Sequence, residues 1–239
     1  MNIQLFIPCF VDQLFPQSAF NMVKVLEKAG CTVNYNENQT CCGQPAFNAG
    51  FREEAKIVCS KFINDFTGKD YIVAPSASCV GFIRNYYAAM FTDSALRHEV
   101  KQLADRTFEF SEFLVNVLKV EDFGAVFPSK VTYHDSCAGL RECKIKNEPR
   151  KLLSKVEGLD LVEMDDVETC CGFGGTFAVK FDTISGAMAD QKTDNAIRTG
   201  TEYIVSTDLS CLMHIQTYAQ KNRKNIKTMH LADVLVQGW

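Results

Sequence analysis

The hydrophobic pattern alternates between short apolar runs and longer segments with apolar residues at helical spacing. Three runs in the first part of the chain have the length of strands, at 3–9, 31–35 and 71–76. Three amphipathic segments follow them in turn, at 16–30, 51–65 and 80–91. The pattern therefore predicts a strand–helix alternation.

The second part of the chain repeats this order. Expected strands lie at 130–137, 159–166 and 203–208, and expected helices at 149–158, 183–200 and 211–221. The segment between the two parts, 93–122, has the spacing of one or two helices. Strands that alternate with helices form parallel sheets with right-handed crossovers. We therefore predict an α/β protein of two tandem-duplicated halves with mostly parallel sheets, related by a pseudo-two-fold axis.

The cysteines carry the clearest sign of this duplication. Eight of the eleven fall into two sets of four with one internal spacing: Cys9, Cys41, Cys42 and Cys79, then Cys137, Cys170, Cys171 and Cys211. Equivalent cysteines are 128, 129, 129 and 132 residues apart, and "YIVAPSASC" in the first set matches "YIVSTDLSC" in the second. The repeat predicts a first cysteine-rich half at 1–93, a helical linker at 94–128 and a second cysteine-rich half at 129–239.

The single cysteines of each set follow expected strands. Cys9, Cys79, Cys137 and Cys211 each stand just past the carboxyl end of one. That edge of a parallel sheet is where ligands bind, and helix N-termini there present N–H groups that suit anionic thiolates. Glycines after both adjacent pairs would let the backbone fold closely around sulfur. Four thiolates from three segments could then converge in each half.

Composition and charge narrow the function classes. The net charge is −4 and the sequence pI about 5.6, with no Lys/Arg block, which argues against nucleic acid or an anionic membrane surface as partner. The N-terminus lacks the pattern of a signal peptide, and no apolar stretch approaches the ~18 residues that span a bilayer. We therefore expect a cytoplasmic protein without membrane insertion, in which cysteines are metal ligands or redox groups.

Thiolate-rich sites suit zinc or iron–sulfur clusters. Cys-x2-Cys occurs nowhere in the chain, which excludes zinc ribbons, thioredoxin-type pairs and ferredoxin-type runs. Three functions stay open on the residues alone: an iron–sulfur redox subunit, a non-catalytic zinc-stabilised scaffold, and a vicinal-dithiol disulfide reductase. "GFGGTF" at 172–177 lacks the full dinucleotide-binding spacing, so a nicotinamide or flavin site is not expected.

The doubled pattern resembles a known cysteine-rich domain. In each half a single cysteine is followed after 31 or 32 residues by Cys-Cys-Gly, and then by a further cysteine. This order is similar to that of the CCG domain found in heterodisulfide reductase and in the glycolate oxidase iron–sulfur subunit. The short length and "STDLSCLMH" at 206–214 most resemble the lactate-utilization protein A (LutA) family. The full CCG pattern has a fifth cysteine, which is replaced here by Ser76 and, when the two repeats are aligned, by Asp208.

This resemblance implies a function and a site. It implies a component of a multi-subunit L-lactate dehydrogenase that oxidises lactate to pyruvate, with a ferredoxin-like iron–sulfur subunit (LutB-like) and a LutC-like subunit as partners. The eight repeated cysteines would hold iron–sulfur clusters, one or two per chain. Four cysteines per half leave both a 4Fe–4S cluster and tetrahedral zinc open, with Ser76 or Asp208 as a hard oxygen neighbour.

Other side chains near the cysteines are weaker candidates. His134 and His214 each stand three residues from a repeated cysteine and could carry protons or serve as spare ligands. Asp135 lies in the same loop as Arg141, which could bind a substrate carboxylate. Cys31, Cys59 and Cys143 have no counterpart in the other half, so we expect them in the core. The aromatic residues of 86–87 and 108–114 are expected to pack or form an interface.

Overall fold

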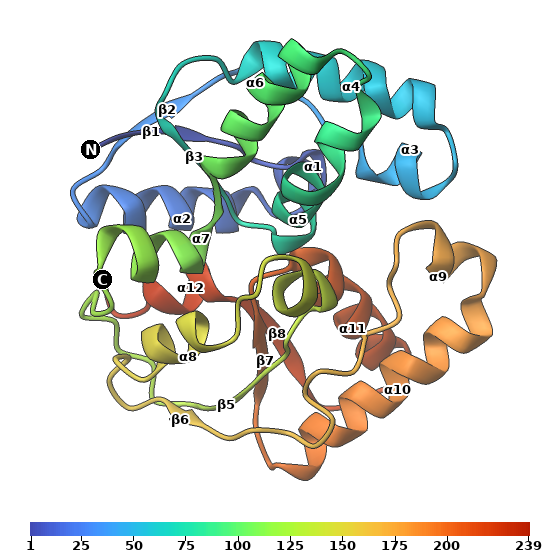
Figure 1. The fold of residues 1–239 in the computed structure, drawn as a ribbon. Helices are drawn as coiled ribbons and strands as arrows, with labels where there is room; N and C mark the ends of the chain where they lie inside the picture. The colour runs from blue at the N-terminus through green and yellow to red at the C-terminus, as the bar shows by residue number, and fades with distance from the viewer.

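The computed structural model describes residues 1–239 and contains two similar halves, each built on a four-stranded parallel sheet (Figure 1). The first sheet has the order β2-β1-β3-β4, with β1 (Asn2–Leu5), β2 (Thr32–Tyr35), β3 (Tyr71–Ala74) and β4 (Thr107–Glu109). The second has the order β6-β5-β7-β8, with β5 (Lys130–Tyr133), β6 (Asp160–Leu161), β7 (Tyr203–Ser206) and β8 (Lys227–His230). The identical order confirms the predicted duplicated α/β fold.

Helices connect the strands of both sheets. In the first half they are α1 (Cys9–Leu14), α2 (Pro16–Lys28), α3 (Gln44–Asn48), α4 (Arg52–Asp65), α5 (Ala77–Tyr86), η1 (Tyr87–Met90), α6 (Ser94–Asp105), α7 (Phe110–Glu112) and η2 (Phe113–Leu118). In the second half they are η3 (Ala138–Glu142), α8 (Asn147–Leu153), α9 (Thr176–Lys180), α10 (Asp182–Arg198), α11 (Leu209–Lys221) and α12 (Leu231–Leu235). No helix is long and apolar enough to cross a membrane.

Three sequence-based expectations needed correction. The segment 93–122, expected to be helical, contains β4, which pairs in parallel with β3. The second half ends in β8 and α12, which were not expected after the helix at 211–221. The strands expected at 3–9, 130–137 and 159–166 are shorter, and Cys9 is already the first residue of a helix. Both missed strands are very short and carry polar residues, so they lack a clear apolar run.

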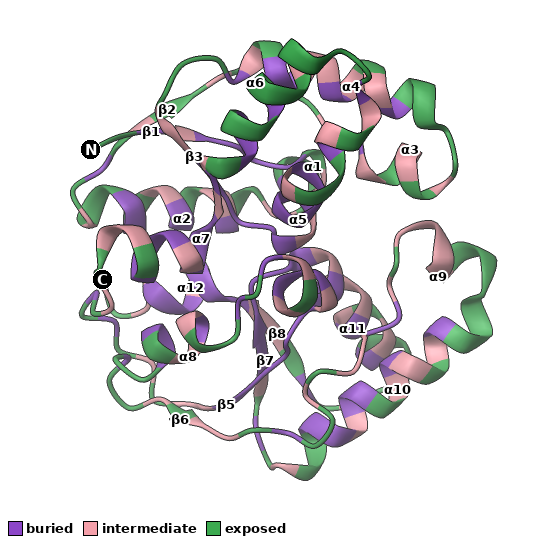
Figure 2. Ribbon diagram, in the orientation of Figure 1, coloured by how far each residue is buried: buried purple, intermediate pink, exposed green.

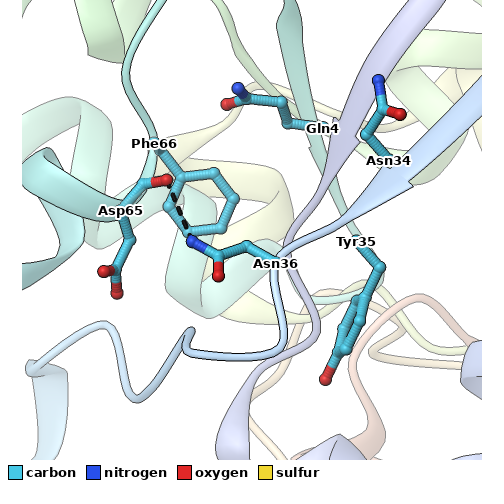
Figure 3. Close-up of a pocket in the computed structure, with 6 residues that line it drawn as sticks. All are labelled: Gln4, Asn34, Tyr35, Asn36, Asp65 and Phe66. Carbon is cyan, nitrogen blue, oxygen red and sulfur yellow. Dashed lines mark hydrogen bonds between the residues drawn. The ribbon is translucent and has the colours of Figure 1, made fainter.

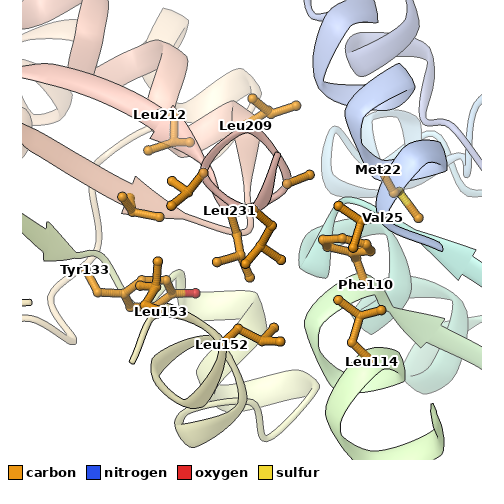
Figure 4. Packing of buried hydrophobic residues seen from close by; sticks show 14 of the residues in the cluster. Met22, Val25, Phe110, Leu114, Tyr133, Leu152, Leu153, Leu209, Leu212 and Leu231 are labelled. Carbon is orange, nitrogen blue, oxygen red and sulfur yellow. The ribbon is translucent and has the colours of Figure 1, made fainter. Parts of the chain in front are cut away.

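The larger of two hydrophobic clusters extends across both halves (Figure 4). Helix α2 of the first half packs on α12 of the second, and α8 of the second half packs on α7 of the first. Met22 and Val25 of α2 face Leu231 of α12 across this contact. The two helix pairs are reciprocal, as a two-fold relation requires.

Polar contacts close the edge of the same interface. The carboxylate of Asp233 on α12 accepts hydrogen bonds from Ser18 Oγ (2.7 Å) and Asn21 Nδ2 (2.9 Å) of α2. Figure 2 shows that buried residues gather on the strands and on the helix faces turned toward this junction. The halves are therefore fixed against each other, with the carboxyl ends of both sheets close to the junction.

Glu109, at the end of β4, gives a pH-dependent prediction. Its side chain is fully buried and caps α7, and burial raises the pKa of its carboxyl to about 8. Between pH 4.5 and 8 the carboxyl is therefore protonated in the native state but ionised in the unfolded chain. Stability contributed at low pH is then lost progressively as the pH rises from 4.5 to 8. Glu109→Gln should raise the free energy of unfolding by roughly 2 kcal/mol at pH 8 and change it little at pH 5.

Denaturant unfolding of both proteins at the two pH values measures this difference. Glu99→Gln is the control, because Glu99 is exposed on α6, forms no ion pair and is not among the groups that shift the pKa of Glu109. A gain at pH 8 that persists undiminished at pH 5 would show that Glu109 is ionised in the native state.

Candidate metal centres

The four repeated cysteines of the first half lie together. Cys9 begins α1, Cys41 and Cys42 lie on the loop before α3, and Cys79 is the third residue of α5. The sulfurs of Cys42 and Cys79 are 3.3 Å apart. The Cys41 thiol lies close enough to those of Cys42 and Cys9 that both shift its pKa. The set therefore forms one connected group of thiols at the carboxyl end of the first sheet.

The second half repeats this arrangement. Cys137 immediately precedes η3, and Cys211 is the third residue of α11. The thiol of Cys170 lies close enough to those of Cys137 and Cys171 that both shift its pKa, and the sulfurs of Cys171 and Cys211 are within 4.8 Å of each other. Each half therefore brings together all four cysteines that the sequence pattern paired with one another.

Backbone N–H groups point at the sulfurs of the adjacent pairs. Gly43 N donates to Cys41 Sγ (3.3 Å), Gly172 N to Cys170 Sγ (3.4 Å) and Phe173 N to Cys171 Sγ (3.5 Å). Hydrogen bonds from neighbouring thiols, first Cys42 and then Cys9, lower the pKa of Cys41 to about 3. Those from Cys137 and Cys171 lower the pKa of Cys170 to about 2. One anionic sulfur per half is thus favoured even among crowded thiols.

One further thiol in each half is harder to ionise than an ordinary cysteine. Hydrogen bonding to the Cys41 sulfur and burial raise the pKa of Cys9, and in the second half the Cys170 sulfur and burial do the same for Cys137. Several negative sulfurs in contact repel one another, so they ionise together only beside a cation. A group of four soft donors with N–H contacts, two of them buried in each half, fits a metal ion or an iron–sulfur cluster.

Glycine is required where the loops fold over the sulfurs. Gly172 has φ +94°, and a Cβ there would lie 2.6 Å from Ser185 O and 2.9 Å from Met188 Cβ. Gly43, at φ +89°, would bring a Cβ within 3.3 Å of Ala55 O. The first loop therefore passes close to α4 and the second against α10, and at Gly172 the approach leaves no space for a side chain without a shift of the backbone.

The two positions that replace the fifth cysteine face each other. Ser76 and Asp208 form an isolated antiparallel β-bridge between the halves. Asp208 is buried, and its carboxylate accepts from Ser78 N of the first half (3.0 Å) and from Ser210 N (3.2 Å) and Ser210 Oγ (2.6 Å) of its own half. Both carboxylate oxygens thus bind the N-termini of the two helices, α5 and α11, that carry Cys79 and Cys211.

Removing this shared cap should weaken the junction of the halves. Asp208→Ala leaves the N–H groups of Ser78 and Ser210 without a partner, so we expect a loss of roughly 2 kcal/mol or more in the free energy of unfolding. Asp93→Ala is the control, because Asp93 caps a single helix in an exposed position through Leu96 N (2.8 Å) and should cost about 1 kcal/mol. Equal losses in the two variants, measured by denaturant unfolding, would contradict the bridging role of Asp208.

His134 is the candidate histidine that lies inside a thiol group. Its side chain is fully buried, and neither ring nitrogen has a hydrogen-bond partner. One ring nitrogen and the sulfurs of Cys171 and Cys211 all lie within 4.8 Å of one another. Burial, followed by the nearby charge of Lys192, lowers the pKa of the imidazole to about 3. Lys192 was not expected from the sequence, since nothing in a helical pattern marks a buried lysine.

The remaining polar candidates lie elsewhere. His214 is half-buried and contacts Ser185 Oγ (3.0 Å), which donates to Gly172 O (2.8 Å), so it supports the cysteine loop from outside. Asp135 forms a two-pronged ion pair with Arg150, with both N–O distances 2.9 Å. Arg141 is exposed on η3.

Cys31, Cys59 and Cys143 are buried, as expected for core cysteines. Cys59 Sγ nevertheless contacts Cys42 O (3.7 Å), and Tyr87 Oη donates to the same carbonyl (2.6 Å). Tyr87 therefore holds the first cysteine loop in addition to packing against Phe62 and Phe82. The hydrogen bond between Tyr87 and Cys42 joins residues 45 positions apart, so no local sequence pattern predicts it.

The pocket drawn in Figure 3 is a different feature. Six residues line it, and none is a cysteine or histidine: Gln4, Asn34, Tyr35, Asn36, Asp65 and Phe66. Asn36 Nδ2 donates to Asp65 O (3.1 Å) across it. This pocket therefore offers no soft metal ligand.

Comparison with known proteins agrees with this organisation. The family model of the cysteine-rich domain CCG matches residues 3–84 and 131–216, one match in each half. The solved structure of a hypothetical protein from Helicobacter pylori matches with a TM-score of 0.58 at 11% identity, covering 98% of this chain and 48% of that one. At that identity the likeness concerns the fold alone.

Two tandem CCG domains on parallel sheets define a duplicated cysteine-rich protein of the α/β class. Lactate utilization protein A 2 of Bacillus cereus is 43% identical over 239 residues, covering 100% of this chain and 99% of the relative. Lactate utilization protein A of an Exiguobacterium species is 44% identical, covering 99% and 98%. The chain belongs to the lactate utilization protein A family.

Proposed function

We propose that this protein is an iron–sulfur redox subunit of a multi-subunit system that oxidises L-lactate to pyruvate. The observation that carries the proposal is the pair of four-thiol groups, each contacted by backbone N–H donors, in a chain of this family. A 4Fe–4S cluster in each half would accept and pass on single electrons. Lactate oxidation releases two electrons and two protons, so two one-electron centres per chain suit the reaction.

The protein's own residues would bind and shield these centres. The ligands would be the eight repeated cysteines, Cys9, Cys41, Cys42 and Cys79 in one half and Cys137, Cys170, Cys171 and Cys211 in the other. Gly43 and Gly172 would bring N–H donors to sulfur, which lowers the energy of the reduced, more negative state. Of the first set, Cys9 is exposed and Cys42 and Cys79 are buried, so Cys9 marks the side from which a partner could exchange electrons.

The chain would act with partners in the cytoplasm. A ferredoxin-like iron–sulfur subunit (LutB-like) and a LutC-like subunit would complete the system, and this chain would require them for activity. The named relatives support this proposal through their lactate utilization names. Division into halves at 1–93 and 129–239 with a linker at 94–128 stays a prediction.

Anaerobic redox spectroscopy tests the proposal. Protein purified without oxygen should show visible absorbance that bleaches when dithionite is added. Lactate should bleach it only when the LutB-like and LutC-like subunits are present. Absence of any absorbance change with dithionite would rule out the redox role and leave a zinc-stabilised scaffold as the explanation of the thiol groups.

A vicinal-dithiol reductase is the second candidate, favoured by the low pKa of Cys41 and by its partial exposure. That function requires a free thiolate that reacts rapidly with an alkylating agent at neutral pH. Alkylation of the metal-loaded protein should be slow at Cys41 if the cysteine is a ligand. Rapid alkylation without loss of metal would favour the reductase.

A further inference from the structure

The two thiol groups have different surroundings at one equivalent position. Phe6 N donates to Val73 O (3.0 Å) in the first half, and His134 N donates to Val205 O (2.8 Å) in the second. The same backbone hydrogen bond, one residue past β1 and β5, makes Phe6 and His134 counterparts. A phenyl ring in one half is thus replaced by an imidazole in the other.

A second exchange accompanies the first. A Cβ added at Gly43 would contact Ala55 and Val58 of α4, and one added at Gly172 would contact Ser185 and Met188 of α10. Ser185 and Met188 each lie 130 residues after their counterparts, so α4 and α10 are equivalent helices. Phe62 then corresponds to Lys192. Phe6 and Phe62 pack edge to face at 4.8 Å, whereas His134 and Lys192 occupy the same places as polar groups.

The ammonium group of Lys192 has hydrogen-bond partners, but the imidazole ring of His134 has none. Lys192 Nζ donates to Asp166 O (2.6 Å) and Val167 O (3.2 Å), on the loop that leads to Cys170. The imidazole of His134 is fully buried with both nitrogens unpaired. Leaving such a group unpaired costs free energy, so a buried imidazole of this kind needs a partner such as a metal.

We propose that His134 is a ligand of the metal centre in the second half, together with Cys171 and Cys211. The inference rests on the proposed function and deepens it, because it makes the two centres unequal. One ring nitrogen already lies within 4.8 Å of both sulfurs. The centre of the first half has thiolates alone, since Phe6 offers no donor atom.

Unequal ligands give the two centres different tasks. A neutral imidazole in place of one thiolate would lower the negative charge of the centre, and histidine ligands that replace cysteine raise the reduction potential of iron–sulfur centres. The buried ammonium group of Lys192 acts in the same direction. Electrons would therefore collect at the second centre, and the first centre would pass them toward it.

Pulsed electron paramagnetic resonance of the reduced, metal-loaded protein tests this assignment. Protein grown with ¹⁵N-labelled histidine should show a coupling of the label to the metal, without any mutation. His134→Phe, which recreates the first half's residue, should abolish the coupling, lower the potential of the more oxidising centre and weaken metal retention in the second half about tenfold or more. His214→Phe should keep the coupling.

Each outcome decides one claim. Loss of the coupling in His134→Phe but not in His214→Phe supports ligation by His134. Metal-loaded protein that shows no histidine coupling overturns it and points to a bound water as the partner of the ring. Protein with no metal in either half overturns the proposed function itself, so the two failures are distinct. If His134→Phe does not fold, the labelled natural protein still decides.

Discussion

Serine in place of both Cys41 and Cys42 is expected to remove one metal centre and leave the other intact. The two sulfurs come from one loop and contact both remaining thiols of their half, so the double change deletes half of that ligand set. No sulfur of the second half depends on this loop, because Cys171 and its neighbours form their own group. The metal and sulfide content per chain should therefore fall by about half.

The reciprocal variant and a matched control sharpen this expectation. Cys170→Ser with Cys171→Ser should remove the other half of the metal, and both pairs together should remove all of it. Cys31→Ala is the control, because Cys31 is a buried core cysteine outside both thiol groups and its loss should leave the metal content unchanged. Unchanged metal in both double variants would show that these cysteines are not ligands.

Alanine at Gly172 is expected to have the largest effect of any single methyl group added to the protein. The new Cβ would stand 2.6 Å from the carbonyl oxygen of Ser185, which belongs to the backbone of α10, so either the loop or the helix must shift. Strain from the positive φ adds about 1–2 kcal/mol to this overlap. The loop that carries Cys170 and Cys171 must then shift, so the second centre should be lost and the free energy of unfolding should fall by roughly 3 kcal/mol or more.

Gly175 supplies the control within the same loop. It also has a positive φ, of +61°, but a Cβ there meets nothing within 4 Å. Gly175→Ala should therefore cost only the backbone strain, about 1–3 kcal/mol because its ψ of −110° lies outside the αL region, and keep the metal of both halves. Denaturant unfolding and metal analysis of the two variants distinguish the steric overlap, which only Gly172→Ala creates, from the backbone strain, which both variants create. Similar losses in both would contradict the close approach of Gly172 to α10.

The repeated cysteines made the duplication and the carboxyl-end location of the thiols predictable. A fixed spacing after apolar strand-length runs is a strong local signal, and each predicted set of four is in fact gathered in one half. The edge strands β4 and β8 were missed because Thr107–Glu109 and Lys227–His230 are short and half polar. Pairing with β3 and β7 makes them strands, and a local pattern does not report that pairing.

Contacts between the halves lie beyond what the sequence reveals. Asp208 stands 130 residues from Ser78, and only the packed halves show that its carboxylate caps both cysteine-bearing helices. The sequence suggested it as an oxygen neighbour of a metal, whereas both of its oxygens accept from helix N-termini. His134 was a weak candidate for the same reason, since its two unpaired nitrogens become apparent only when its burial is known.

Iron, zinc and acid-labile sulfide per chain, measured on anaerobically purified protein together with its visible spectrum, test the central claim most directly. Two filled 4Fe–4S sites predict about eight irons and eight sulfides per chain, at four of each per site, with brown colour that bleaches on reduction. Up to two zinc ions without sulfide, in colourless protein, would contradict the redox role and make the thiol groups structural.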